Sequence, residues 1–249
     1  MSNGILYITY GRKYVSAAIH SATTAREHCP GILIHLFVDK VFFEEFGFAK
    51  DTAPFTSVSV IENPHRRSKV DYISRSPFDR TLYMDSDTSV AQDISGVFDV
   101  LDRFDIAAIH AMRRNSRRAH EFWTKPIPSA FPHFNGGIIL YRNTPKVLEL
   151  LRNWSVAYAE SGSSHDQATL RELIWDSDLR VATLPPEYNV RFMKFKYFWS
   201  KTEAVPMIYH LKKYHQDWLR IFVLTPIDAV LRLFGIRWVT IAKKLHLPR

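Results

Sequence analysis

The sequence predicts an α/β fold with a mainly parallel central sheet flanked by helices. Short apolar runs rich in β-branched and aromatic residues alternate with helical patterns, which is the order of elements in parallel sheets covered on both faces. The chain has 249 residues, 46% of them hydrophobic, so one α/β domain or two small ones can bury a sizeable core. No internal repeat or low-complexity segment points to another architecture.

The apolar runs define the expected strands, which are residues 4–9, 32–39, 57–62, 81–84, 105–110 and 135–141. Helices are expected between them. One begins near Tyr14, and another ends at Ser76 because the residue before a proline avoids the helical region. A third covers 144–158, with Thr144 as its cap and a proline at its first position. A fourth follows Ser164, its expected cap.

Two aspartates, Asp85 and Asp87, stand at the end of the strand expected at 81–84. Side chains two residues apart on a strand point the same way, so both carboxylates can face one spot. In parallel sheets, ligands bind outside the carboxyl ends of the strands, where Asp39 also falls. Hard carboxylate oxygens suit Mg²⁺ or Mn²⁺. The pattern is compatible with such a metal site or with a plain polar turn. A second Asp-x-Asp at 176–178 ends a helical pattern and is expected to be a turn.

The charge of the chain is unevenly distributed. The net charge is +8. From Leu211 onward there are eight Lys or Arg and two Asp, whereas the first 210 residues are nearly neutral.

Cys29 is the only cysteine, which excludes an intrachain disulfide and a zinc site built on thiolates. We expect a cytoplasmic location, because we find no signal-peptide pattern and no apolar run long enough to span a membrane.

Five segments in a fixed order resemble the GT-A-fold glycosyltransferases, which transfer a sugar from a nucleotide-diphosphate donor. The nearest type is family 8, which includes glycogenin and bacterial lipopolysaccharide galactosyltransferases. The segments are SKVDYISRSPFDR, TLYMDSDTSV, FNGGIILYRN, HDQATL, and PPEYNVR followed by IYHLKKYHQDW. The resemblance covers roughly residues 4–218. It implies a catalytic domain over 1–217, followed by a basic amphipathic helical tail over 218–249.

The resemblance implies a divalent ion, Mn²⁺ or Mg²⁺, held by Asp85, Asp87 and His210, with His215 as a rival of His210. It also implies a set of donor-binding residues: Thr9, Tyr10, Asp39, Lys69, Asp85, Ser86, Asp87, Asn135, Gly136, Gly137, Lys212 and Lys213. Either lysine of the last pair can contact phosphate. The glycines permit close backbone approach to a ligand, or they form a β-bulge. The family's acidic residue in the first loop is replaced by Thr-Tyr-Gly here, so UDP- and GDP-sugars both remain candidate donors.

Asp166 and Gln167 are the expected catalytic residues, with Asp166 accepting hydrogen bonds from sugar hydroxyls and Gln167 near the anomeric carbon. If the reaction inverts the configuration of the sugar, Asp166 is the candidate base. If it retains the configuration, as family 8 enzymes do, no base is needed. The expected activity is metal-dependent transfer to a glycan or lipid-linked acceptor.

Two surfaces suggest how an acceptor is reached. The loop at 110–126 carries four arginines with Phe122 and Trp123, and it can either grip an anionic acceptor or be a solvated charge run. The tail, 218–249, can lie on an anionic membrane surface as a peripheral contact, or pack on the core or on a second subunit.

Two other functions compete with sugar transfer. A haloacid-dehalogenase-type phosphatase has Asp-x-Asp-x-Thr/Val after an apolar strand, but Ser89 stands where threonine or valine belongs. A sequence pI near 9.5 is compatible with a non-enzymatic nucleic-acid binder, but the charge lies in the tail and one loop, and no nucleic-acid-binding motif is present. We therefore expect a glycosyltransferase with no nucleic-acid partner.

Overall fold

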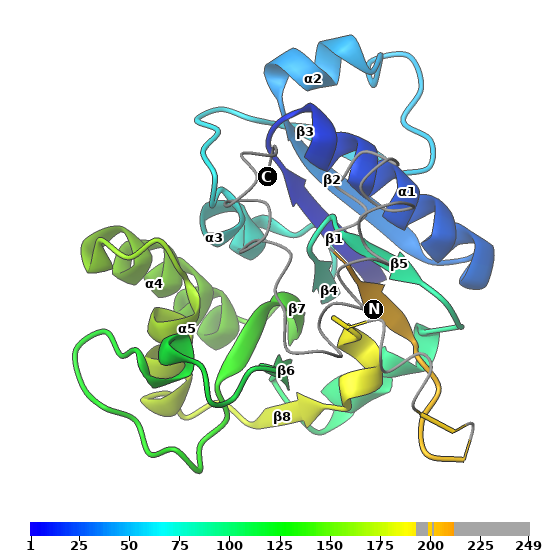
Figure 1. The fold of residues 1–249 in the computed structure, drawn as a ribbon. Helices are drawn as coiled ribbons and strands as arrows, with labels where there is room; N and C mark the ends of the chain where they lie inside the picture. The colour runs from blue at the N-terminus through cyan, green and yellow to red at the C-terminus, as the bar shows by residue number, and fades with distance from the viewer. Residues whose placement is uncertain (193–198, 201, 212–249) are drawn as a thin grey trace, which may run out of the picture. The chain divides into compact units, whose positions relative to one another are not determined.

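In the computed structural model, which describes residues 1–192, 199–200 and 202–211, seven strands form a central sheet in the order β3-β2-β1-β4-β7-β6-β8 (Figure 1). Their bounds are β1 Asn3–Thr9, β2 Leu33–Asp39, β3 Ser57–Ile61, β4 Arg80–Met84, β6 Ile106–His110, β7 Phe134–Arg142 and β8 Val181–Leu184. All of them are parallel except β7, which is antiparallel to both of its neighbours. The prediction of a mainly parallel sheet is confirmed.

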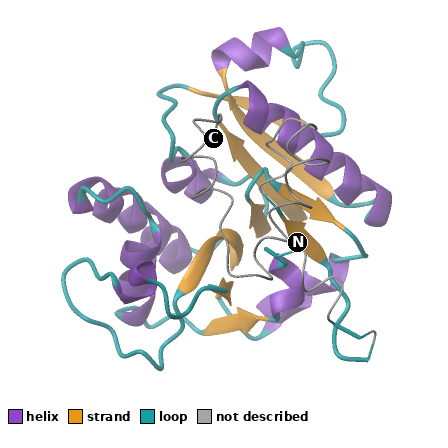
Figure 2. Cartoon of the chain, viewed as in Figure 1, coloured by secondary structure: helices purple, strands orange, loops and turns teal. Residues whose placement is uncertain are grey.

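Helices cover both faces of this sheet (Figure 2). The α-helices are α1 Arg12–His28, α2 Lys40–Glu45, α3 Lys69–Tyr72, α4 Pro145–Ser161 and α5 Gln167–Trp175. The 3-10 helices are η1 Ile73–Arg75, η2 Ser95–Asp102, η3 Arg117–His120 and η4 Pro186–Asn189. The helix expected before Ser76 is therefore the short pair α3–η1, and it ends where predicted.

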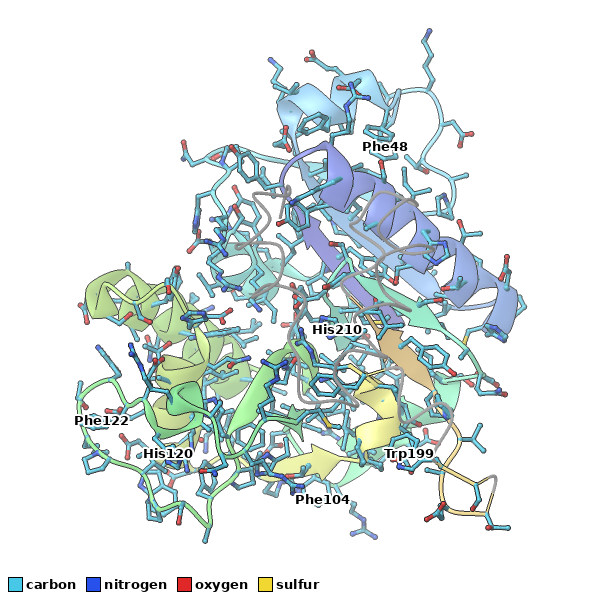
Figure 3. All side chains as sticks on the ribbon, in the orientation of Figure 1. Phe48, Phe104, His120, Phe122, Trp199 and His210 are labelled. Atoms are coloured by element: carbon cyan, nitrogen blue, oxygen red, sulfur yellow. The ribbon has the colours of Figure 1, made fainter. Side chains whose placement is uncertain are left out.

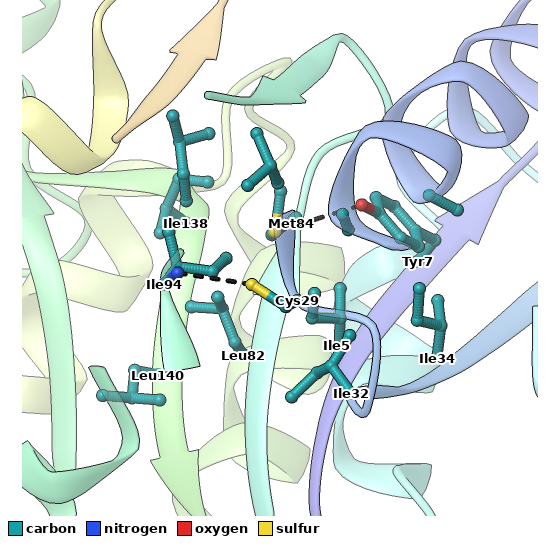
Figure 4. Close-up of a cluster of buried hydrophobic side chains, with 14 of the residues drawn as sticks. Ile5, Tyr7, Cys29, Ile32, Ile34, Leu82, Met84, Ile94, Ile138 and Leu140 are labelled. Atoms are coloured by element: carbon teal, nitrogen blue, oxygen red, sulfur yellow. Dashed lines mark hydrogen bonds between the residues drawn. The ribbon is translucent and has the colours of Figure 1, made fainter. Parts of the chain in front are cut away.

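Strand β1 shows why the sheet is buried on both faces. Its side chains alternate, so that Ile5 and Tyr7 belong to the core beneath α1, whereas Leu6 and Ile8 belong to the core beneath α4 and α5. Figure 4 shows the first of these cores, in which Ile5 packs with residues of β4 and β7. Strands that are apolar throughout rather than alternating are typical of parallel sheets, and these are the segments that the sequence revealed.

Two helix starts differ from their expectation in detail. Helix α5 begins at Gln167, and Asp166 rather than Ser164 occupies the N-cap position. The prediction for Ser164 is wrong because its hydroxyl is paired with the ring of His165, at 2.9 Å from Nδ1. Thr144 does occupy the N-cap position of α4, but its side chain makes no cap hydrogen bond. The second Asp-x-Asp follows the last residue of α5 and forms a turn, as expected.

A small second sheet, absent from the sequence prediction, lies beside the carboxyl end of β4. It pairs β5 (Thr88–Val90) with β9 (Ile208–His210) in antiparallel register, with Thr88 opposite His210. The hydroxyl of Thr88 anchors it to the core through Ser21, at 2.7 Å. This sheet connects the chain directly after Asp87 to a segment far along the sequence.

Candidate active site

The Asp85–Asp87 turn is held in place by backbone contacts. The amide of Asp85 donates to the carbonyl of Gly137 at 2.7 Å, and the hydroxyl of Thr88 donates to the carbonyl of Asp85 at 2.8 Å. Ser86 is buried between the two aspartates. Because β4 ends at Met84, the turn stands at the carboxyl edge of the sheet, the edge at which ligands of parallel sheets bind.

The small sheet brings His210, which is labelled in Figure 3, to both aspartates. Its Nε2 lies 3.0 Å from Asp87 Oδ1 and 3.7 Å from Asp85 Oδ2. One ligand atom from each of the three residues lies within 4.8 Å of the others. His210 is 2% exposed, and its Nδ1 is 2.7 Å from Oδ1 of buried Asn189. Since Asn189 Oδ1 only accepts, Nδ1 donates to it, and Nε2 is the ring nitrogen directed at the carboxylates.

The residues present fit a divalent ion. Two carboxylates and one neutral imidazole form a ligand set suited to Mn²⁺ or Mg²⁺. The backbone of Gly137 lies directly against these side chains. A Cβ at this position would lie 2.5 Å from His210 Cε1 and 2.6 Å from Asp85 Oδ2. The backbone therefore approaches these side chains so closely that only glycine fits. The register between β6 and β7 shifts at the same place, as it does at a β-bulge or a similar irregularity.

Gly137→Ala is expected to destabilise the fold by about 1–3 kcal/mol, because the added methyl forces His210 and Asp85 apart. Chemical denaturation measures this loss. Gly96→Ala is the matched control, since nothing lies within 4 Å of a Cβ at that position. An equal effect of the two substitutions would contradict the close packing at Gly137.

A buried ion pair lies next to the acidic pair. Lys69 Nζ is 2.8 Å from Asp166 Oδ2, donates to the carbonyl of Gly136 at 2.8 Å, and is 3.7 Å from Asp85 Oδ1. Burial alone would lower the pKa of Lys69, but the carboxylates of Asp166 and Asp85 outweigh it and raise that pKa. Burial would raise the pKa of Asp166, but Lys69 and then Arg67 hold it below its ordinary value. Both groups are charged at neutral pH.

Two further residues, which the sequence analysis did not select, complete this network. Tyr83 donates its hydroxyl proton to Asp85 Oδ1 at 2.7 Å, and burial, followed by the Asp85 charge, raises the pKa of Tyr83 well above 10. Arg67 lies 3.9 Å from Asp166 Oδ1 and donates to the carbonyl of Ser164. Tyr83 was recognisable in principle, because it stands two residues before Asp85 on one strand and shares its face.

The other expected donor residues lie in several places. Asn135 Oδ1 accepts from the amide of Gly137 at 2.9 Å, so this side chain supports the irregular part of β7 directly. Asp39 is buried, caps α2 and accepts from the amide of Gly11, and Thr9 is buried at the end of β1. Tyr10 is exposed beside them. Lys212, Lys213, His215 and the tail 218–249 lie outside the described residues.

Helix α5 also fixes the arginine-rich loop between β6 and β7. Arg171 donates to the carbonyls of Pro128, Phe131 and Pro132. The next residue, Glu172, accepts from the amides of Trp123, Thr124 and Lys125 and from the Thr124 hydroxyl. Two buried charges at the middle of α5 thus hold the second half of the loop, 123–132, against the helix that begins with Gln167.

The arrangement of strands, helices and acidic turn is that of GT-A glycosyltransferases. The chain is similar to the galactosyltransferase LgtC, solved with donor and acceptor sugar analogues, at a TM-score of 0.61 and 14% identity over 84% of this chain and 86% of that one. It is similar to mouse xyloside xylosyltransferase 1 at a TM-score of 0.56 and 14% identity, over 84% and 97%. For GlyE of Streptococcus pneumoniae TIGR4 the TM-score is 0.60 and the identity 18%, and the match spans 84% of this chain but only 54% of GlyE.

A match between the sequence and a protein family assigns the chain more specifically than the likeness of its fold does. Residues 72–217, more than half of the chain, match the family described as nucleotide-diphospho-sugar transferase, and the chain belongs to this family. It is therefore a glycosyltransferase of the GT-A class, and the phosphatase and nucleic-acid-binding alternatives are set aside. No curated protein sequence matches the chain. Among the described residues, we find no helix with the length and hydropathy required to span a bilayer.

Proposed function

We propose that this glycosyltransferase is metal-dependent, and that Asp85, Asp87 and His210 hold Mn²⁺ or Mg²⁺ against the diphosphate of a UDP- or GDP-sugar. The observation that carries the proposal is the convergence of these three side chains at Gly137. His210 reaches the aspartates only because β9 pairs with the strand that follows them, so the small sheet serves to build this cluster. A divalent ion bound there would stabilise the negative charge that develops on the leaving nucleotide diphosphate.

Lys69 supplies a second positive charge next to this cluster. Its ammonium group is only 8% exposed and is fixed between Asp166, the Gly136 carbonyl and Asp85. A cation held in this way needs no reorganisation when charge develops on the donor. Tyr83 stays protonated and holds Asp85 by its hydroxyl, so that the second carboxylate oxygen remains directed toward His210.

Asp166 acts as a hydrogen-bond acceptor for the sugar and as the partner of Lys69, rather than as a base. A carboxylate whose pKa is lowered by two cations is a weak proton acceptor. This argues for transfer with retention of configuration, the course that requires no base on the acceptor hydroxyl. Gln167, the first residue of α5, is the neutral side chain next to it at the reacting carbon.

For the acceptor we propose a glycan or a lipid-linked sugar. The argument for a lipid-linked one is the basic, amphipathic sequence at 218–249, which suits a peripheral contact with an anionic membrane.

Metal dependence is tested by thermal unfolding of the full chain with UDP or GDP, each with and without Mn²⁺. We expect stabilisation by a nucleotide only when Mn²⁺ is present, by about 2.7 kcal/mol at a hundredfold excess over the dissociation constant. Asp87→Asn should abolish the effect. Asp178→Asn is the matched control, because it alters the exposed second Asp-x-Asp. Equal stabilisation in EDTA would overturn the proposed metal site.

A further inference from the structure

A pocket of about 300 Å³ lies between the loop that follows β6 and helix α5. Its walls include His110, Arg114, Phe122, Phe131, His133 and Arg171. In Figure 3, His120 and Phe122 mark the loop side of this region, away from His210. The volume is at the lower end of the range for small-molecule sites and suits one sugar unit or a group of similar size.

The inner wall of the pocket connects it to the reaction site. His133 directly precedes β7, the strand that carries Asn135 and the two glycines, and the side chain of Gln167 interacts with its ring. His133 is 5% exposed, and its Nδ1 has no hydrogen-bond partner among the described residues. Burial, followed by the charge of Arg171, lowers the pKa of His133 to about 4, so the ring is neutral at pH 7 and carries one proton. The hydrogen bond with the Gln167 side chain raises this pKa, so the ring donates its proton to Gln167 and Nδ1 is an acceptor. A buried acceptor without a partner is costly, and a hydroxyl of a ligand can complete it.

The charges around the pocket favour an anion. Among the described residues that line the pocket, Arg114 and Arg171 are basic and only Glu121 is acidic. Arg171 is 5% exposed, and within the described part of the chain no carboxylate lies at ion-pair distance from it. Its Nε and Nη2 are bound only to carbonyl oxygens, and burial lowers the pKa of its guanidinium. A buried cation without a counter-charge is stabilised when an anion binds nearby.

Apolar residues supply the other half of the lining. Phe122 is 56% exposed, and Phe131 lies beside it in the pocket wall. One exposed and one half-buried aromatic ring next to a few polar groups are the composition expected of a ligand pocket rather than of a solvated charge run. Arg171 and Glu172 anchor the second half of the loop, 123–132, so the side of the pocket that carries Phe131 is preformed.

We propose that this pocket binds the acceptor and recognises an anionic oxygen group on it, a carboxylate or a phosphate, through Arg114 and Arg171. The inference rests on the proposed function, because it identifies the class of molecule that receives the sugar. The anionic group would lie over the two arginines, with the sugar ring of the acceptor against Phe122 and one of its hydroxyls donating to Nδ1 of His133. The hydroxyl that receives the sugar would then point past Gln167 toward the donor.

Calorimetric titration of the full chain in Mn²⁺ and UDP tests the proposal. The probes are glucose, glucuronic acid, glucose 6-phosphate and inorganic phosphate. We expect at least one anionic sugar to bind about tenfold more tightly than glucose, with the carboxylate and phosphate probes identifying the group. Inorganic phosphate alone should bind more weakly than the sugar that carries it, because it makes no contact with Phe122.

Three variants locate the binding. Arg114→Gln and His133→Phe should each weaken the anionic sugar about tenfold, whereas Arg152→Gln, an exposed arginine on α4, should not. Nucleotide binding with Mn²⁺ is measured in the same samples. Two outcomes would overturn the acceptor inference while nucleotide binding leaves the proposed metal site standing. In the first, glucose binds as tightly as every anionic probe. In the second, Arg114→Gln and His133→Phe have no effect. If UDP and GDP do not bind at all, the proposed function itself fails.

Discussion

Replacement of His210 by glutamine is expected to lower kcat/KM for sugar transfer by on the order of a thousandfold. In the proposed metal site, Nε2 of His210 completes the ligand set of two carboxylates, and it lies 3.0 Å and 3.7 Å from their oxygens. Without it, two carboxylates remain to hold a divalent ion against the diphosphate. The measurement is the initial rate of transfer, or of donor hydrolysis, as a function of Mn²⁺ concentration. We expect both a lower maximal rate and a higher Mn²⁺ requirement.

Asn189→Ala tests the hydrogen bond that orients His210 separately from His210 itself. Asn189 is fully buried and accepts from Nδ1 of His210, so its loss should weaken Mn²⁺ binding by about 10–100-fold without removing a ligand. The exposed His28→Gln, on α1, is the matched control and should behave as the unmodified protein does. Full activity of His210→Gln at an unchanged Mn²⁺ requirement would show that the third ligand lies elsewhere.

The sequence was sufficient to predict the inner strands of the central sheet because they are apolar on both faces. The expected strand at 81–84 is β4, Arg80–Met84, and the run at 135–141 is β7, Phe134–Arg142, and both agree within one residue. Such runs are easy to recognise, since nearly every position is buried, whereas the edge strand β8 has only one buried residue and is not among the expected strands. The direction of β7 was not evident, because an apolar run carries no information about the orientation of its neighbours.

The candidate site could be predicted only in part, for a physical reason. Asp85 and Asp87 belong to one short segment, but β5 and β9 have three residues each, too few for a periodic pattern. Their pairing is a contact between distant segments, and only the family resemblance suggested His210. Asn189 and Arg67 were also not predictable, because each contacts a residue far away in sequence: Asn189 contacts His210, and Arg67 contacts Asp166. Arg171 and Glu172 were missed because they lie on a helix where charged residues are ordinarily solvated.

The buried pair of Lys69 and Asp166 should produce the largest loss of stability on substitution. Lys69→Met leaves Asp166, 2% exposed, without its ammonium partner, and we expect the free energy of unfolding to fall by about 3–5 kcal/mol. Urea denaturation at pH 7 measures it. Lys125→Met is the matched control, because its ion pair with Asp176 is exposed and should contribute at most about 1 kcal/mol. The double variant Lys69→Met, Asp166→Leu should recover part of the loss, since no buried charge is then left unpaired.

The pH dependence of this loss distinguishes electrostatics from packing. In the unmodified protein the pKa of Asp166 is lowered, so its contribution to stability is complete above the ordinary carboxyl pKa and is lost as the pH falls through the folded value. The raised pKa of Lys69 keeps the ammonium charged over this range. In Lys69→Met, burial without the ammonium should raise the pKa of Asp166, and acidification then relieves the buried charge. The difference in stability between the two proteins should therefore shrink from pH 7 to pH 4, whereas a packing defect alone would leave it constant.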